Sequence, residues 1–289
     1  MADRGILSSL RYLLADIIGD DDDAPPFLPE GLPEPVMAAA SEAIHLLIDY
    51  QGPSYAHLYV DRLRRFIGKQ GVDEAMLADI ARLMALRMSY EDPVRIAQLK
   101  LFELDGPGAP AGSVDVKKFR IEELIGALPA VVAEYLLDAL DWAGWSNKRV
   151  SIRFSTASRL GIRRLKIEAG LRRWRLLSVR YARERVLVER WLHMIDRSLT
   201  KQPEAAPAIV QTATMIEGYG DVYRQGLADW NAIIDSLVKP TFDGVLALPD
   251  LGNAVTEARA AALPDPRQSV LKRKIAEIRG RATASSYLV

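Results

Sequence analysis

The sequence contains no cysteine and only three histidines among 289 residues. Without cysteine the chain cannot form a disulfide, bind an iron–sulfur cluster through thiolates, or use a cysteine nucleophile. The histidines, His45, His57 and His193, stand apart from any carboxylate pair with the spacing of a metal site. We therefore interpret them as core or surface side chains and predict no metal site.

Motifs for phosphate binding and hydrolysis are also missing. The glycines between Gly106 and Gly112 do not follow an apolar strand, and neither Gly-Lys-Ser/Thr nor Gly-x-Ser-x-Gly occurs. No apolar run approaches the roughly 20 residues that a membrane-spanning helix needs, and no signal cleavage site follows the short apolar start. The sequence predicts a cytoplasmic protein without catalytic residues of its own.

The charges balance over the whole chain but are segregated along it. Lysine and arginine number 38, as do aspartate and glutamate, which argues against a surface that binds polyanions throughout. Residues 20–23 form an acidic run, whereas residues 148–201 are strongly basic. We expect the basic segment to face an acidic surface of this chain or of another subunit, and nucleic acid is the alternative.

Helical periodicity covers most of the chain. Apolar residues recur with helical spacing at 35–49, 54–67, 73–87, 92–101, 119–125, 130–142, 205–217, 223–237 and 255–262. Alternation of apolar and polar residues predicts a single strand, Arg149 to Phe154. The expected fold is mainly α, a multi-helix bundle with one long basic helix and at most a small β hairpin.

The long basic helix is predicted at about residues 159–199, a stretch that lacks proline and is dense in arginine. A continuous helix of this length would extend roughly 60 Å. Its apolar residues are spaced by three, four and seven positions, as in a helix that packs along a partner helix: Trp174, Leu177, Tyr181, Val188, Trp191 and Ile195.

Proline, glycine and charge divide the chain into three parts. Residues 1–35 are predicted to form an amphipathic arm followed by an acidic, proline-rich linker. Residues 36–262 form the helical domain, in which the loop at 105–114 separates two helical groups. Residues 263–289 are polar and basic, which predicts a last helix and a loose C-terminal tail.

Two local clusters stand out. Residues 88–100 place acidic groups at the start of a helix and Arg95 on its body, and residues 217–226 form a glycine-flanked turn with Asp221 as the expected N-cap. A capped helix and a tight corner between helices explain the two clusters without a ligand.

These clusters carry a resemblance, together with residues 49–51 and 55–63 and the arginine-rich series at 171–175 and 180–184. In this order they resemble the DUF6537-like, C-terminal helical region of the beta subunit of indolepyruvate ferredoxin oxidoreductases. The resemblance spans roughly residues 40–240. It departs from the family at Val222-Tyr223, where threonine and histidine are expected, and at Pro93, where threonine is expected.

The resemblance implies an accessory, non-catalytic subunit of a 2-oxoacid oxidoreductase, which forms acyl-CoA from an aryl 2-oxoacid. It implies that the gamma-type α/β domain is absent or separate, and that thiamine diphosphate and the iron–sulfur clusters lie on a partner subunit. The candidate contacts to a subunit or to a phosphate of coenzyme A are Arg95, Arg172, Arg173, Arg175, Tyr219 and Asp221. An internal ion-pair lattice is the structural alternative. The alternative functions are a nucleic-acid-binding module and a self-associating scaffold.

Overall fold

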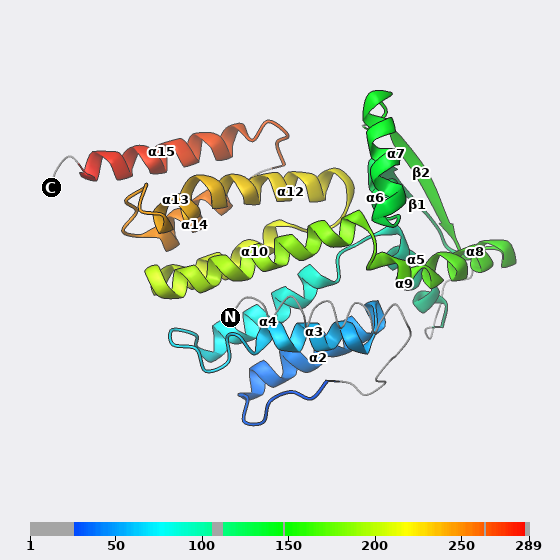
Figure 1. Cartoon of the computed structure of the whole chain (residues 1–289), viewed down its shortest axis with the longest axis horizontal. Helices are drawn as coiled ribbons and strands as arrows, with labels where there is room; N and C mark the ends of the chain where they lie inside the picture. The colour runs from blue at the N-terminus through cyan, green and yellow to red at the C-terminus, as the bar shows by residue number, and fades with distance from the viewer. Residues whose placement is uncertain (1–25, 106–111, 147, 263, 287–289) are drawn as a thin grey trace. The chain divides into compact units, whose positions relative to one another are not determined.

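A computed structural model of the chain describes residues 26–105, 112–146, 148–262 and 264–286. In this part of the chain the fold is mainly α-helical with one two-stranded antiparallel sheet, which confirms the predicted fold class (Figure 1). Residues 1–25 of the predicted arm and residues 106–111 of the predicted loop lie outside the described residues. No helix among the described residues is long and apolar enough to cross a membrane.

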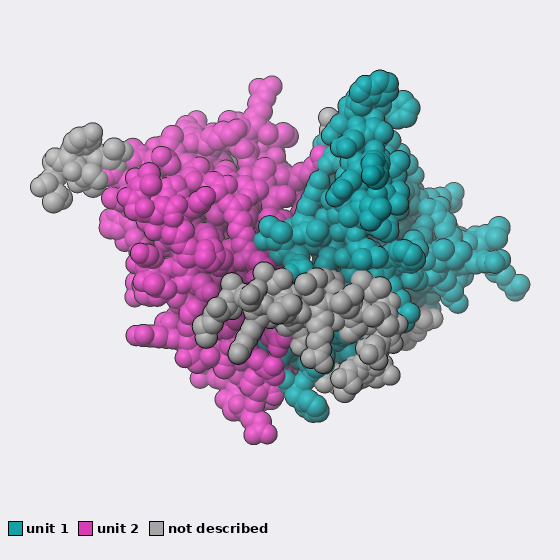
Figure 2. Space-filling view, viewed as in Figure 1, with its two compact units in different colours: residues 1–27, 44–60, 88–186 teal, residues 28–43, 61–87, 187–289 magenta. Residues whose placement is uncertain are grey.

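The chain is organised in two compact units (Figure 2). Unit 1 comprises residues 1–27, 44–60 and 88–186, and unit 2 comprises residues 28–43, 61–87 and 187–289. Each unit therefore combines segments from before and after the 105–114 loop. The helices α2 (Glu34–Tyr50), α3 (Pro53–Leu63), α4 (Glu74–Met88) and α10 (Val179–Lys201) contribute residues to both units.

Unit 1 contains the sheet and the short helices around it. Its further elements are α5 (Pro93–Asp105), β1 (Val114–Arg120), α6 (Ile121–Gly126), α7 (Ala130–Trp142), β2 (Arg149–Ser155), α8 (Arg159–Gly170) and α9 (Arg172–Arg175). The predicted strand at 149–154 is confirmed as β2. Its partner β1 was not predicted, and it takes Phe119 and Arg120 from the helix expected at 119–125.

The sheet buries one aromatic side chain from each strand. Phe119 and Phe154 are both buried, and their rings meet edge to face at a centroid distance of 6.4 Å. The register pairs Phe119 with Val150 and Asp115 with Phe154. These paired positions lie 31 and 39 residues apart in the sequence (150 − 119 and 154 − 115). Because the partner of β1 is this distant, local sequence spacing gave little signal for the strand.

The prediction of a single long helix at 159–199 is wrong, because the structure divides this stretch into α8, α9 and α10. The last break has a tertiary cause. The carbonyl of Leu177 accepts a hydrogen bond from the backbone of Ala130 at 2.9 Å, so this segment pairs with the start of α7. The Ser178 hydroxyl then accepts from the backbone N–H of Tyr181 at 3.0 Å, an N-cap contact that starts α10.

Unit 2 packs helices in layers. Beyond its parts of α2, α3, α4 and α10 it contains η1 (Pro203–Ala205), α11 (Ala206–Val210), η2 (Gln211–Met215), α12 (Gly220–Ile233), η3 (Ile234–Val238), α13 (Lys239–Phe242), α14 (Leu251–Ala260) and α15 (Ser269–Ser286). Within this unit α12 lies between α10 and α15 (Figure 1). The predicted last helix is confirmed as α15, which buries Leu271, Ile275 and Ile278.

Two buried tryptophans hold the irregular segment at 203–215 in unit 2. The indole N–H of Trp191 donates to the carbonyls of Ile209 and Val210, each at 3.2 Å. The indole N–H of Trp230 donates to the Thr212 hydroxyl at 3.1 Å. These contacts fix a series of short turns where the sequence predicts one helix at 205–217.

A close approach between backbones explains Gly226 in α12. A Cβ atom at this position would lie 1.9 Å from the carbonyl oxygen of Met215. We expect Gly226→Ala to lower the free energy of unfolding by about 1–3 kcal/mol through overpacking. Gly280→Ala on α15, where nothing lies within 4 Å of the added atom, should instead raise it by about 0.5–1 kcal/mol. Urea titrations of both variants measure the difference, and equal effects would contradict the packing.

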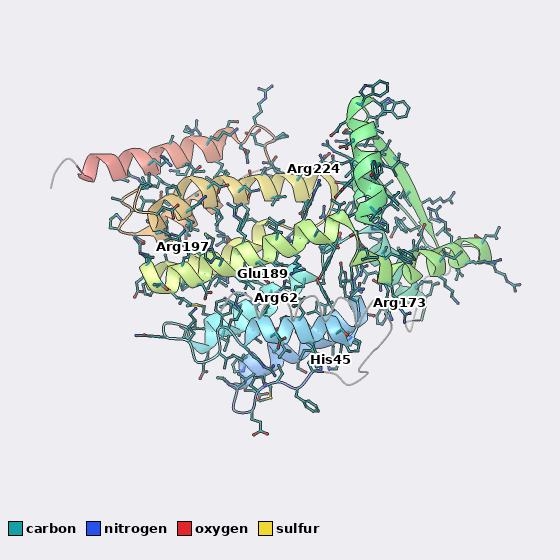
Figure 3. The ribbon with its side chains drawn as sticks, in the orientation of Figure 1. His45, Arg62, Arg173, Glu189, Arg197 and Arg224 are labelled. Carbon is teal, nitrogen blue, oxygen red and sulfur yellow. The ribbon has the colours of Figure 1, made fainter. Side chains whose placement is uncertain are left out.

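Within unit 2 the acidic side chains of α10 pair with basic side chains of α3 and of the turn that follows it, so here the basic segment does not face an acidic surface. Glu189 on α10 accepts hydrogen bonds from Arg62 Nε at 2.8 Å and from Arg65 Nη1 at 2.9 Å, and Arg62 and Glu189 face each other in Figure 3. Asp196, about two turns further along α10, contacts Lys69. Although burial opposes it, attraction by Arg62 and Arg65 holds the pKa of Glu189 below its usual 4.5.

The lowered pKa of Glu189 sets the sign of a pH dependence. The ion pairs stabilise the folded state above the unfolded-state pKa, and this contribution is lost as the pH falls through the lower folded-state pKa. Because the Glu189 side chain is 43% exposed, we expect Glu189→Gln to cost no more than about 1 kcal/mol at neutral pH. That difference from the wild type should shrink in urea titrations between about pH 6 and pH 3. A constant difference would contradict the assignment.

Candidate functional site

Arg175 is the centre of a buried polar cluster in unit 1. Its side chain is only 1% exposed, and it forms a bidentate pair with Asp92 through Nε to Oδ2 at 2.7 Å and Nη2 to Oδ1 at 3.1 Å. Its Nη1 donates to the carbonyl of Tyr50 at 2.9 Å and to Gln51 Oε1 at 3.1 Å, and Nη2 also donates to Gln98 Oε1 at 3.4 Å. All five guanidinium donors are therefore occupied within the chain.

Local sequence places Asp92 to meet this arginine. Asp92 precedes α5, and its Oδ1 accepts the backbone N–H of Arg95 at 2.6 Å, as expected of an N-cap. The same carboxylate receives the guanidinium of Arg175 from the single turn α9. Burial disfavours the charged guanidinium, but the groups around it, Tyr50 and Asp92, raise the pKa of Arg175 above its usual value.

Tyrosines close the cluster. The Arg175 guanidinium lies 4.0 Å from the centroid of the Tyr50 ring, and the Tyr50 hydroxyl donates to the carbonyl of Tyr90 at 3.1 Å. Burial raises the pKa of both Tyr50 and Tyr90 well above the usual range. These phenols therefore stay protonated and neutral, and they offer no general base near neutral pH.

Arg95 joins the same cluster from α5. Its Nη1 pairs with Asp49 Oδ2 at 2.7 Å, and its guanidinium lies 5.6 Å from the centroid of the Tyr50 ring. The structure thus brings together two of the six candidate residues, Arg95 and Arg175, as parts of an ion-pair lattice that links α2, α5 and α9. The carboxylates that pair with them belong to this chain.

The other four candidates lie apart from this lattice. Arg172 and Arg173 have exposed side chains on α9, although the carbonyl of Arg172 accepts a hydrogen bond from Gln51 Nε2 at 3.0 Å. Tyr219 and Asp221 belong to unit 2, at the start of α12. The prediction of Asp221 as the N-cap is wrong. Tyr219, with extended backbone angles of φ −144° and ψ 172°, is the N-cap, and Asp221 lies in the first helical turn.

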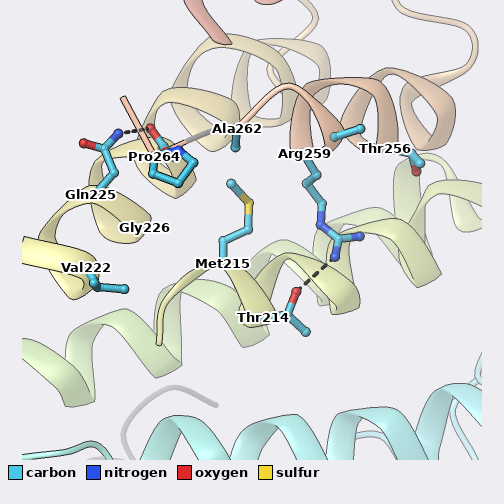
Figure 4. Close-up of a pocket in the computed structure, with 11 residues that line it drawn as sticks. Thr214, Met215, Val222, Gln225, Gly226, Thr256, Arg259, Ala262 and Pro264 are labelled. Carbon is cyan, nitrogen blue, oxygen red and sulfur yellow. Dashed lines mark hydrogen bonds between the residues drawn. The ribbon is translucent and has the colours of Figure 1, made fainter. Parts of the chain in front are cut away.

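A cavity of about 550 Å³ opens in unit 2 between α12, α14 and η2 (Figure 4). The predicted cluster at 217–226 supplies Val222, Gln225 and Gly226 to its wall. Sequence reasoning missed the other side of the cavity, to which η2 and α14 contribute Thr214, Met215 and Arg259. A single arginine on an amphipathic helix gives no sequence signal, since the cavity forms only when the three elements pack.

A second feature missed from the sequence is the apolar surface of unit 1. Of the 23 large apolar side chains that are exposed among the described residues, 16 fall between Val114 and Val186. The densest group lies on one helix, and we call it the α7 face: Val131, Val132, Tyr135, Leu136 and Trp142. Trp142 is 92% exposed. Trp174, predicted on the apolar seam, is also half exposed.

The described residues contain no group of three histidine, aspartate or glutamate side chains close enough to hold a metal ion. A family model described as a family of unknown function, DUF6537, matches residues 36–236. No curated protein and no solved structure matches the chain.

Proposed function

We propose that the chain, which belongs to the DUF6537 family over residues 36–236, is an accessory, non-catalytic subunit of a 2-oxoacid oxidoreductase of the indolepyruvate type. The complex would convert an aryl 2-oxoacid and coenzyme A to acyl-CoA. Thiamine diphosphate and the iron–sulfur clusters would belong to a catalytic partner, and a gamma-type α/β subunit would complete the assembly. The ordered motifs described above, from residues 49–51 to 217–226, support this assignment.

The α7 face is the observation that carries a subunit role. Soluble proteins rarely expose contiguous apolar surface unless it binds a partner. In α7 only Ala133 and Leu140 are buried, while Val131, Tyr135 and Trp142 point into solvent although the helix is strongly apolar. Aromatic side chains of this kind are enriched at the centres of protein interfaces and supply much of their binding energy.

The exposed arginines of α9 support an acidic partner. Arg172 and Arg173 precede the half-exposed Trp174, and neither side chain belongs to the Arg175 lattice. Arginine and tryptophan together are common in protein interfaces. Charge complementarity at such a surface would guide association with an acidic subunit, or would hold the phosphates of coenzyme A.

A low-salt pull-down of the tagged chain from its native host tests the proposal. We expect mass spectrometry to identify a thiamine- and iron–sulfur-containing oxidoreductase subunit in the eluate. Recovery of the chain alone would contradict a heteromeric role and favour a self-associating scaffold.

Nucleic acid binding is the second candidate function, and the exposed Trp174 beside Arg172 and Arg173 favours it. Such a site would stack a base on the indole and contact phosphates with the guanidinium groups. Its affinity would fall steeply with salt concentration. Nuclease treatment of the lysate separates the two functions, since it would leave the protein partner bound and would remove a nucleic acid.

A further inference from the structure

The cavity of unit 2 contains an arginine without an acidic partner. Arg259 extends from α14 toward η2, where its Nη2 donates to the Thr214 hydroxyl at 3.0 Å (Figure 4). Its Nε is buried and has no hydrogen-bond partner among the described residues. No carboxylate of the described chain forms an ion pair with it. Arg259 thus differs from Arg175, whose five donors are all occupied.

This arrangement is unfavourable for a protein without a ligand. Burial lowers the pKa of Arg259, because the partly desolvated guanidinium loses hydration without gaining an opposite charge. The Thr214 hydroxyl accepts one hydrogen bond from the guanidinium and donates its own hydrogen to the carbonyl of Gln211 at 2.8 Å, so it satisfies one donor but supplies no negative charge. An anion in the cavity would supply both the charge and the acceptor that Arg259 lacks.

The rest of the cavity selects the kind of anion. Its walls include the apolar side chains of Met215, Val222, Ala262 and Pro264, and its volume of about 550 Å³ lies within the range of small-molecule sites. Gly226 allows α12 to approach the Met215 backbone, and both residues line the cavity. A small inorganic anion would leave most of this apolar surface uncovered.

A buried carboxylate on the α12 side limits the charge of the ligand. Asp229 Oδ1 accepts hydrogen bonds from Gln225 Nε2 at 2.8 Å and from Gln268 Nε2 at 2.7 Å. The two amides hold Asp229 without neutralising it. A second negative charge on the ligand would be repelled from this side of the cavity.

We propose that the cavity binds an organic monocarboxylate with an apolar body, whose carboxylate pairs with Arg259 and whose body packs against Met215 and Val222. This site rests on unit 2 alone and does not depend on the proposed role of unit 1 in a complex. It would give the chain a ligand of its own.

Calorimetric titration of the full chain with phenylacetate tests the site. We expect saturable binding of phenylacetate, no binding of the neutral phenylacetamide, and at least tenfold weaker binding of inorganic phosphate. Phosphate binding as tight as phenylacetate binding would overturn the apolar part of the proposal. Equal binding of phenylacetamide, or no binding of phenylacetate, would overturn the role of the charge.

Variants assign the binding to Arg259. Arg259→Gln should weaken phenylacetate binding at least tenfold, and Arg273→Gln, which changes an exposed arginine on α15, should leave it unchanged. Because the substitution removes an uncompensated charge, the melting temperature of Arg259→Gln should equal or exceed that of the wild type. A marked fall would show that Arg259 is structural. Val222→Asp, at a 70% exposed position of the wall, should also weaken binding, and unaltered affinity would contradict the site.

Discussion

Replacement of Asp92 by alanine is expected to lower the free energy of unfolding of unit 1 by about 3–5 kcal/mol. The substitution leaves Arg175 charged and buried, with its Nε and one Nη2 contact unpaired. It also removes the N-cap of α5, which contributes roughly 1 kcal/mol to such a loss. Urea unfolding, monitored through hydrogen exchange of the backbone amides in α5 and α9, measures the loss of unfolding free energy in these helices.

Matched variants separate burial from charge. Asp49→Ala breaks the neighbouring pair with Arg95, but the Asp49 side chain is 63% exposed, so the expected cost is below about 1 kcal/mol. Asp92→Asn keeps an N-cap acceptor and should cost less than alanine. Combining Arg175→Met with Asp92→Leu should restore part of the stability that Asp92→Ala loses. If Asp92→Ala and Asp49→Ala had equal costs, the buried lattice would be contradicted.

Replacement of Trp142 by alanine is expected to weaken partner binding by at least about 2 kcal/mol, or roughly 30-fold. The side chain is 92% exposed in the chain alone and lies at the C-terminal end of α7, and a large aromatic group on an apolar face is a typical interface anchor. Quantitative pull-down, or titration of the isolated partner, measures the loss. The melting temperature of the chain should not change.

The control for Trp142 is an exposed apolar residue outside the α7 face. Val245 in unit 2 is 79% exposed, and Val245→Ala should leave partner binding unaltered. Retention of the partner by Trp142→Ala, or equal losses in the two variants, would show that the α7 face is not the interface. Either result would leave the buried lattice and the cavity of unit 2 unaffected.

The helices could be predicted because their apolar periodicity is local. The same periodicity could not show where neighbouring elements interrupt a helix, as the pairing of Leu177 with Ala130 does before α10. The strand β1 was missed for a similar reason, since its pairing partner β2 is distant in sequence. Local patterns therefore predicted the fold class and the C-terminal helix, while tertiary contacts decided the breaks.

The candidate site was predictable only in part. The density of arginine at 172–175 and the acids before α5 drew attention to Arg175 and Arg95, and the structure places both in the internal lattice that was the structural alternative. Sequence could not tell that Arg175 would be 1% exposed while Arg172 and Arg173 stay in solvent, since this depends on the orientation of a single turn. Arg259 had no local pattern at all, because its lack of an acidic partner is a property of the packed unit.

The most direct test of the subunit assignment is an activity assay on material isolated through the tagged chain. Indolepyruvate oxidation that depends on coenzyme A, followed by reduction of an electron-accepting dye, would report the complete complex. We predict that this activity elutes with the wild-type chain and is lost when Trp142→Ala is the bait. Activity that remains in the unbound fraction, with none eluting with the chain, would contradict the account.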